Sequence, residues 1–435
     1  MKTRITKTLS RNIKTMLTLA LMAGLTLITT GINSAAQDTP VLGARGLARM
    51  RWQGISRHAS RLNHSPDAPT SSPTWSLLIP GYSTSELFFD TLLSEHSAVY
   101  DSSSNTMIVF GGLLQDDTPR NSVLLETNAN GSGGIEAGMW SELKVNIFPP
   151  ARMLHSAVYD QANNRMIVFG GCADLECDIP LNDAWVLTNA NGTGGSPTWT
   201  QLSPSGSLPS PRYFHNAVYD ATNNRMIVYS GQAAGYTSLS DVWVLSNANG
   251  LGGTPAWTQL TPTGATPDAQ DESTAVYDPV SNTLIAFGGG NFVNSVWTLS
   301  NANGLTGTPA WSNIVANGAK GAPRGRDGAQ AVYDPASNRM TICGGNGDFG
   351  PTTPDSDVGT FNDVWVLTNA NGSGGAPTWT QLHPKFAGDG LILPGTRDYF
   401  TAVRDPGTNS MIIFGGVSIE AAYGSPWVLN HASGL

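Results

Sequence analysis

Charged residues are scarce in this sequence, and cysteines and long apolar segments are scarcer still. Charged side chains make up 13% of the 435 residues, with 32 Asp and Glu against 23 Lys and Arg. So few charges disfavour long solvated helices, whereas 49 Gly and 27 Pro favour many short strands joined by tight turns. Beyond residue 36 no segment is apolar enough to span a bilayer. We therefore expect an all-β protein with no membrane span in its mature chain.

Three cysteines are too few for a disulfide framework. Cys172 and Cys177 lie five residues apart in one predicted loop, where an oxidising compartment would allow them to bridge, although the sequence leaves this open. Cys343 lies in an apolar run typical of a buried strand, so we expect a buried free thiol there. The core must therefore be held mainly by packing.

Residues 1–36 have the order of features typical of a secretory signal peptide. A basic start without acidic residues precedes an apolar run at 16–28, and the small residues Ser34-Ala35-Ala36 follow. We therefore predict a secreted or periplasmic protein. Cleavage would remove five basic residues and change the formal net charge from -9 to -14. Such an acidic chain would be repelled by phosphate backbones, so we expect no nucleic-acid partner. Residues 37–72 fit no repeat and carry several arginines, which indicates a basic linker.

An internal repeat dominates the rest of the chain. The tetrapeptide Ala-Val-Tyr-Asp occurs at 98–101, 157–160, 217–220, 275–278 and 331–334, with a variant at 402–405. Each copy is followed by an apolar run, which ends in a Gly pair in five of the six units. A variable loop comes next, and then a run that carries Trp in five of the six units. An Asn/Gly-rich turn follows that run. In five units a fourth run led by Trp follows. This pattern predicts four antiparallel strands per unit.

The sixth unit has no fourth strand of its own before the sequence ends. A spare Trp-bearing run stands at 73–78, before the first repeat. A row of such sheets exposes two apolar ends unless it closes into a ring. We therefore predict a six-bladed propeller over 73–430, with the strand 73–78 on the outer edge of the last blade.

The repeat resembles the kelch-repeat β-propeller family, of the secreted bacterial type, over residues 73–430. The resemblance rests on the Gly pair, the Trp of the fourth strand, and an Arg-x-x-His before the first strand, as at 152–155 and 212–215. Kelch propellers include protein binders, sugar oxidases and sugar isomerases, so the resemblance predicts the fold rather than the function.

The candidate site residues are those expected at the mouth of the central channel. In propellers of this kind, the loops that join second to third strands and fourth to first strands gather there. Arginines hold ligand carboxylates well, although each could instead pair within its own protein. Two carboxylates replace the Arg-x-x-His pattern in the fourth unit. The candidate ligand-binding residues are Arg152, Arg212, Asp271, Glu272, Arg326, Arg397 and Tyr399.

Three histidines, His96, His155 and His215, share one repeat position on neighbouring blades, where equivalent positions diverge. We therefore expect structural roles and no metal site. No nucleophile–base pair or phosphate loop is present, so we expect no catalytic residue and no cofactor.

The leading hypothesis is a monomeric extracytoplasmic module that binds a protein or glycan through its mouth loops. An alternative is a sugar-active enzyme resembling the six-bladed sialic-acid mutarotase, with the four arginines and Glu272 as its residues. A copper enzyme resembling galactose oxidase fits less well, because its paired Tyr and His ligands are not evident here.

Overall fold

The computed structural model describes residues 72–83, 90–348, 358–388, 393–418 and 422–435. Contacts divide the chain into two units, 1–61 and 62–435, and everything below concerns the second. The predicted signal peptide 1–36 and almost all of the predicted linker 37–72 lie outside the described residues. Within the described ranges, no helix is long and apolar enough to cross a membrane.

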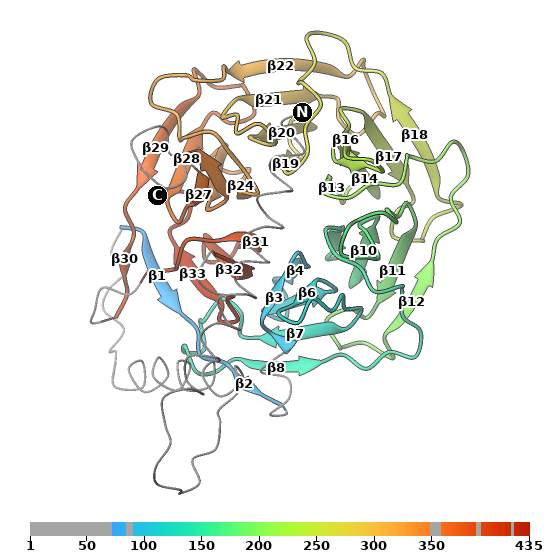
Figure 1. Ribbon diagram of the computed structural model, residues 1–435, viewed down its shortest axis with the longest axis vertical. Coiled ribbons are helices and arrows are strands. Elements are labelled where there is room, and N and C mark those ends of the chain that lie inside the picture. The colour runs from blue at the N-terminus through green and yellow to red at the C-terminus, as the bar shows by residue number, and fades with distance from the viewer. Residues whose placement is uncertain (1–71, 84–89, 349–357, 389–392, 419–421) are drawn as a thin grey trace, which may run out of the picture. The chain divides into compact units, whose positions relative to one another are not determined.

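The named elements of the described residues are β-strands, and most of them form six main sheets (Figure 1). The first sheet contains β4 (Ser97–Asp101), β5 (Thr106–Phe110), β7 (Val123–Thr127) and β8 (Met139–Glu142). The second contains β9 (Ser156–Asp160), β10 (Arg165–Phe169), β11 (Ala184–Thr188) and β12 (Thr198–Gln201). The third contains β13 (Asn216–Asp220), β14 (Arg225–Tyr229), β17 (Val242–Ser246) and β18 (Ala256–Leu260).

The next two sheets repeat this order. The fourth contains β19 (Thr274–Asp278), β20 (Thr283–Phe287), β21 (Val296–Ser300) and β22 (Ala310–Val315). The fifth contains β24 (Gln330–Asp334), β25 (Arg339–Cys343), β28 (Val364–Thr368) and β29 (Thr378–Leu382). In these five sheets each strand pairs antiparallel with the one before it, as the four-run pattern predicts.

The sixth sheet combines both ends of the propeller region. It contains β31 (Asp398–Asp405), β32 (Ser410–Val417) and β33 (Trp427–Asn430), and β33 pairs antiparallel with β1 (Thr74–Leu77). Trp75 stands opposite Leu429 and is 2% exposed. The spare strand thus pairs with the last sheet. The outermost position belongs instead to the two-residue β30 (Lys385–Phe386), which runs parallel to β1. A second parallel addition, β2 (Gly81–Tyr82), lies beside β8.

Three small hairpin sheets supplement the main ones. Their strands are β3 (Leu93–Ser94) with β6 (Leu113–Leu114), β15 (Gln232–Ala233) with β16 (Thr237–Ser238), and β23 (Arg326–Asp327) with β26 (Asn346–Asp348) and β27 (Val358–Thr360). Each hairpin lies between the second and third strands of a repeat or just before its first strand. These hairpins hold the connections that carry the candidate site.

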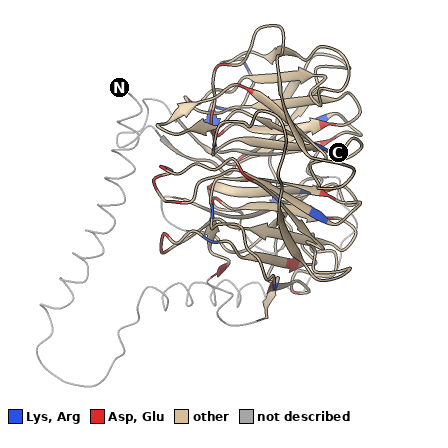
Figure 2. Cartoon of the chain, turned by 90° about the vertical axis from the view of Figure 1, so that its right-hand side faces the viewer, with Lys and Arg blue, Asp and Glu red and all other residues tan. Residues whose placement is uncertain are grey.

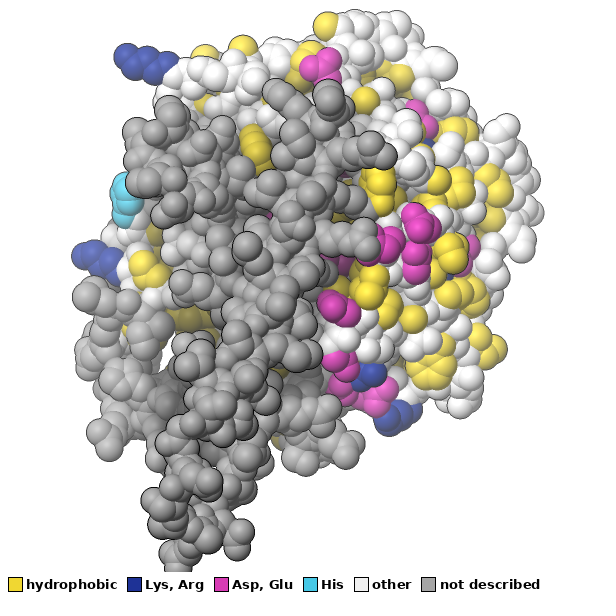
Figure 3. Space-filling model, viewed as in Figure 1, with side chains coloured by type: hydrophobic (Ala, Val, Ile, Leu, Met, Phe, Trp, Pro, Cys, Tyr) yellow, Lys and Arg dark blue, Asp and Glu magenta, His cyan; other side chains and the backbone are white. Residues whose placement is uncertain are grey.

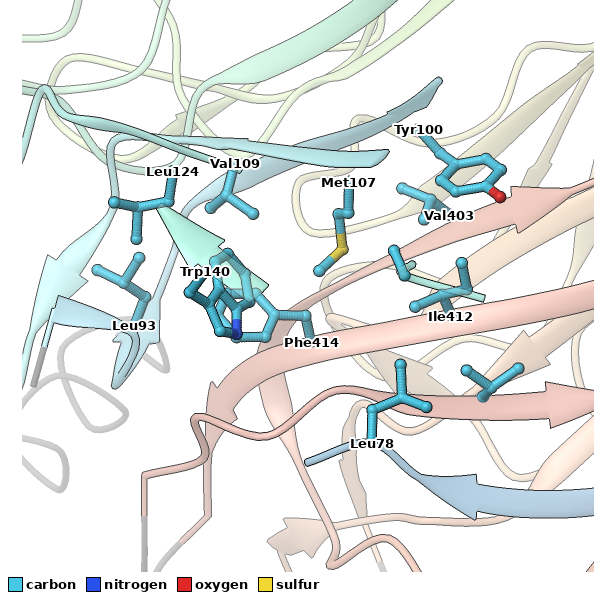
Figure 4. Packing of buried hydrophobic residues seen from close by; sticks show 12 residues of the cluster. Leu78, Leu93, Tyr100, Met107, Val109, Leu124, Trp140, Val403, Ile412 and Phe414 are labelled. Carbon is cyan, nitrogen blue, oxygen red and sulfur yellow. The ribbon is translucent and has the colours of Figure 1, made fainter. Parts of the chain in front are cut away.

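Apolar cores fill the spaces between neighbouring sheets. Buried residues form clusters shared by sheets one and two, two and three, three and four, four and five, and five and six. A further cluster joins sheets six and one, where the rings of Trp140 and Phe414 lie 4.7 Å apart between centroids (Figure 4). Because each sheet buries both faces against neighbours, strand residues such as Ile108 and Ile167 have no exposed surface.

Side-chain hydrogen bonds join neighbouring sheets where the first strand of each sheet ends. The Asp of the repeated tetrapeptide accepts a hydrogen bond from an Asn in the turn of the following sheet: Asn249 donates to Asp160 at 2.6 Å, and Asn371 to Asp278 at 2.7 Å. Asn130 of the first sheet donates to Asp405 of the sixth at 2.7 Å. The Asn-Gly turns therefore serve packing between sheets.

Candidate functional site

Six residues at one repeat position surround the central axis. They are Glu95, Leu154, Phe214, Glu272, Gly328 and Tyr399, and each has a positive φ between 54° and 61°. The first five each lie two residues before the first strand of their sheet, and Tyr399 is the second residue of β31. Only one of the six is glycine, so the other five adopt a backbone conformation that costs side-chain-bearing residues free energy.

Backbone hydrogen bonds connect these six positions in sequence. The amide of Leu154 donates to the carbonyl of Glu95 at 2.9 Å, and that of Phe214 donates to Leu154 at 3.1 Å. In the same way, the amide of Glu272 donates to the carbonyl of Phe214, that of Gly328 to Glu272, and that of Glu95 to Tyr399. The remaining amide, of Tyr399, donates instead to the Asp398 carboxylate at 2.8 Å. The strained backbone is thus held by neighbouring sheets, and it fixes the position of each side chain.

A cavity of about 250 Å³ lies at this place, lined by the first residues of the inner strands. Glu95, Glu272, Phe214 and Tyr399 belong to its lining, and none of the described residues that line it is Lys or Arg. The rings of Phe214 and Tyr399, from the third and sixth repeats, stack with centroids 6.0 Å apart. This volume is below the range typical of pockets for drug-sized ligands, so it suits a single side chain or sugar ring.

Several carboxyl groups lie near Glu272, although among the described residues only Glu95 lines the cavity with it. Burial first, and then the charges of Asp327, Asp398, Asp271 and Glu95, raise the pKa of Glu272 well above its usual value. Burial likewise raises the pKa of Asp398 to about 7 and that of Asp327 well above its usual range. The charge of Glu272 is the largest cause that raises the pKa of Tyr399, so this phenol remains a hydrogen-bond donor at neutral pH.

A side chain of the hairpin β15–β16 contacts Asp271. Gln232 donates to Asp271 and its own carbonyl oxygen Oε1 accepts from Tyr213 at 2.5 Å. Figure 3 shows acidic side chains gathered near the centre of this face among scattered apolar ones. In the perpendicular view, acidic residues appear in loops on the left side of the sheets and also on the opposite side (Figure 2).

The three histidines at one repeat position connect neighbouring inner strands. Nε2 of His155 lies 2.8 Å from the Ser97 hydroxyl, and that of His215 lies 2.7 Å from the Ser156 hydroxyl. Nε2 of His96 lies 3.0 Å from the Thr401 hydroxyl. Burial lowers the pKa of His96 and His215 to about 3, so both are neutral and supply no positive charge to the cavity. This geometry supports the structural role expected from the sequence.

Three of the predicted arginines lie between sheets rather than in the cavity. Arg152 has no exposed surface and donates two hydrogen bonds to Asp183, at 2.7 and 2.9 Å, and a third to the Gly170 carbonyl. Arg212 makes the same bidentate pair with Asp241, and Arg326 with Asp363. While these bonds persist, the guanidinium groups offer no donor to a ligand. Burial raises the pKa of Asp183, but the bonds and charge of Arg152 outweigh it and leave that pKa below its usual value.

Arg397 is the exception among the four. It is 1% exposed, it donates to the carbonyls of Gly395 and Gly415, and its guanidinium lies 4.3 Å from the centre of the Tyr423 ring. Among the residues that the structure describes, its Nη2 has no hydrogen-bond partner. Burial lowers the pKa of Arg397 to about 10, so it remains charged at neutral pH. It too lies outside the cavity lining.

The structure thus divides the predicted site residues into two groups. Glu272 and Tyr399 belong to the cavity lining, whereas Asp271 and the four arginines do not. Sequence reasoning missed Asp327 and Asp398, because each directly follows a motif arginine that drew attention first. Aligning the repeats reveals them, since Asp271, Asp327 and Asp398 occupy one repeat position in three successive units.

Cys172 and Cys177 form a disulfide in the loop beside the second sheet, and Cys343 is a buried free thiol. Across the described part of the chain, no group of three or more His, Cys, Asp or Glu side chains is placed to hold a metal ion.

Comparison with known proteins supports the fold class. No family model matches the chain. An F-box/kelch-repeat protein of Arabidopsis thaliana is 35% identical over 97 residues, which are 22% of this chain and 19% of that protein. A leucine-zipper-like transcriptional regulator homologue of Drosophila melanogaster is 33% identical over 180 residues, covering 40% of this chain and 16% of that protein. A Rho GTPase-activating protein of Dictyostelium discoideum is 25% identical over 187 residues, covering 39% and 11%. The chain thus spans less than a fifth of the length of each of these relatives.

Among solved structures, that of YjhT, with a kelch-type fold, matches with a TM-score of 0.53 at 14% identity, over 78% of this chain and 93% of that one. At this identity the match shows the fold alone. Together with the four-stranded antiparallel sheets, these findings define a kelch-like β-propeller. Such a fold suggests a protein-binding or an enzyme-like module.

Proposed function

We propose that this chain is an exported, monomeric recognition module, a six-bladed kelch propeller that binds a protein or glycan at its channel mouth. The observation that carries the proposal is the cavity at the mouth, where strained backbone presents Glu272, Phe214 and Tyr399 together. Strained positions held by surrounding structure are typical of binding and catalytic sites. Export is supported by the signal-peptide pattern at 1–36 and by the Cys172–Cys177 disulfide, because disulfides persist mainly outside the cytoplasm.

The six-bladed closed architecture is part of the same proposal. Its support is the pairing of β1 with β33, together with the apolar cluster and the Asn130–Asp405 hydrogen bond that join the first and sixth sheets. Replacing Trp75 with Ala should lower the free energy of unfolding by about 3–5 kcal/mol, as for other buried Trp residues. Urea denaturation of the mature protein measures this loss. A loss below 1 kcal/mol would show that the N-terminal strand does not hold the last sheet.

A sugar-active enzyme has less support from this geometry. The mutarotase-like hypothesis requires arginines that grip a sugar carboxylate, but Arg152, Arg212 and Arg326 are buried in bidentate pairs with aspartates. The mouth instead presents carboxyl groups, which would repel an acidic sugar. A binding role for the mouth requires none of the three arginines.

The test begins with a glycan array and a peptide library screened with the mature protein. Ligands selected there are titrated against the variant Glu272→Gln/Tyr399→Phe, which alters the cavity, and against Glu142→Gln on the outer strand β8. We expect the cavity variant to weaken binding at least tenfold and the β8 variant to leave it unchanged. Selected ligands that bind the cavity variant with unchanged affinity, or the absence of any selected ligand, would contradict the proposal.

A further inference from the structure

The guanidinium of Arg397 is buried, and its hydrogen bonds within the described residues go only to backbone carbonyls. Nε donates to the Gly395 carbonyl at 3.2 Å and Nη1 to the Gly415 carbonyl at 3.3 Å, whereas the buried Nη2 has no partner among those residues. The titratable groups that act on this charge are the Cys343 thiol and the Tyr423 phenol, and neither is a carboxyl group. A buried charge without an opposite charge costs free energy that a bound anion would recover.

The other repeats show which group compensates an arginine at this position. Three repeats pair the Arg with an Asp that lies two residues before the Trp of the third strand. These pairs are Arg152–Asp183, Arg212–Asp241 and Arg326–Asp363. Two repeats have neither the Arg nor the Asp. At the two positions the first has Leu93 and Ser122, and the fourth has Gln270 and Ser295. The sixth repeat combines Arg397 with Ser425, so it has the cation without its acid.

The fifth repeat shows which donors hold the carboxylate. Asp363 accepts hydrogen bonds from Nη1 and Nη2 of Arg326, and Nε1 of Trp365 donates to it at 2.7 Å. In the sixth repeat, Trp427 pairs with the second strand of its sheet in the same register as Trp365. The corresponding donors are therefore Nη2 of Arg397 and Nε1 of Trp427.

An aromatic ring lies over the guanidinium in both repeats. The guanidinium of Arg326 lies 4.1 Å from the centre of the Phe361 ring, and that of Arg397 lies 4.3 Å from the centre of the Tyr423 ring. Because Arg326 contacts Phe361 and Asp363 at the same time, a ring at this position leaves space for a carboxylate. The Asp363 side chain is 23% exposed, so solvent reaches this position.

We propose that Arg397 and Trp427 bind the carboxylate group of a ligand, in the position that an aspartate side chain takes in three other repeats. A guanidinium binds a carboxylate through strong charge-assisted hydrogen bonds, and the indole N–H adds a further donor. Ser425 has a shorter side chain than Asp, which leaves the ligand space for its carboxylate. Arg397 and Trp427 do not belong to the lining of the mouth cavity, so this site is separate from the proposed function.

The experiment compares the mature wild-type protein with Ser425→Asp, which supplies the carboxylate from the chain itself. Urea denaturation is measured in separate series of sodium formate and sodium chloride. A ligand that binds only the folded protein stabilises it by mass action, so about 100 mM formate with a dissociation constant of about 10 mM increases the folding equilibrium constant about tenfold. We expect this response in the wild type and less than about a twofold response in Ser425→Asp.

Ser295→Asp is the matched control. It places an acid at the same position of the fourth repeat, where Gln270 replaces the arginine. Without formate, Ser425→Asp should increase the folding equilibrium constant at least about tenfold, because it compensates a buried charge. Ser295→Asp should not increase it, and this variant should keep the wild-type response to formate. Saturation-transfer NMR detects formate on the folded protein directly, and Ser425→Asp should abolish that signal.

Three results would overturn the proposal. They are equal formate responses in the wild type and Ser425→Asp, an equal response of the wild type to chloride and formate, and equal stabilisation by Ser295→Asp and Ser425→Asp. N-acetylglycine identifies the source of the carboxylate. A response like that to formate supports a larger ligand that ends in a carboxylate, and a response to formate alone supports a free small ion.

Discussion

Replacing Asp398 with Asn should change how the stability of this protein depends on pH. The Asp398 side chain is 5% exposed, and burial raises its pKa from 3.8 to about 7. Oδ1 accepts the Tyr399 amide hydrogen bond, which the amide oxygen of Asn can also accept. The substitution therefore removes the titration and keeps the contact.

The expected size follows from proton linkage. A carboxyl group whose pKa is higher in the folded protein stabilises the fold at low pH, and this contribution is lost as the pH rises through the folded pKa. A shift from 3.8 to about 7 is about three pK units, and at 1.36 kcal/mol per unit the total loss is about 4 kcal/mol. More than half of it falls between about pH 5 and 8. Because Glu272 and Asp327 interact with Asp398, the transition belongs to the cluster as a whole.

Urea denaturation at pH 5, 6, 7 and 8 measures the effect, with Asp268→Asn as a control that changes the net charge equally at an exposed position. Wild-type protein and the control should lose stability as the pH rises, and Asp398→Asn should lose distinctly less. At pH 8 the variant should be the more stable protein. If wild type and Asp398→Asn show the same pH dependence, the carboxyl cluster does not share protons as the structure indicates.

Two further predictions concern buried charges away from the mouth. Asp183→Asn leaves the buried Arg152 uncompensated and should lower the free energy of unfolding by about 3–5 kcal/mol in urea denaturation; a loss below 1 kcal/mol would show that the pair is not needed. Glu126 has no exposed surface, and neither of its carboxyl oxygens has a partner among the described residues, while burial raises its pKa well above the usual value. The equivalent residue of the second repeat is Leu187, so Glu126→Leu should raise the free energy of unfolding by about 1–3 kcal/mol, more at pH 8 than at pH 5. An unchanged thermal midpoint at pH 8 would contradict this.

The repeat made the strands predictable, because each apolar run is bounded by turn residues and recurs six times. The pairing of β1 with the last sheet was predicted from a missing strand at one end and a spare one at the other. The two-residue strands were not predictable, since β30 and β2 are too short to show a period of two. β30 therefore occupies the edge that the sequence had assigned to β1.

The candidate site was predicted only in part. Glu272 and Tyr399 break the repeat and line one cavity, whereas Asp271 shares its repeat position with Asp327 and Asp398. The arginines recur in the repeat, and the structure gives three of them an aspartate partner close to the next tryptophan, as Asp183 is to Trp185. A recurring residue serves a contact that every repeat makes, and this regularity favoured the structural interpretation that the sequence analysis left open.

The sequence by itself determined the strands, their order and the turns, because these depend on local periodicity and on the conformational preferences of Gly and Asn. Only the tertiary structure decided the chemistry of the mouth. Asp271, Asp327 and Asp398 are more than fifty residues apart from one repeat to the next, and their protonation depends on burial and on one another's charge. Both effects arise only when the sheets bring the repeats together around one axis.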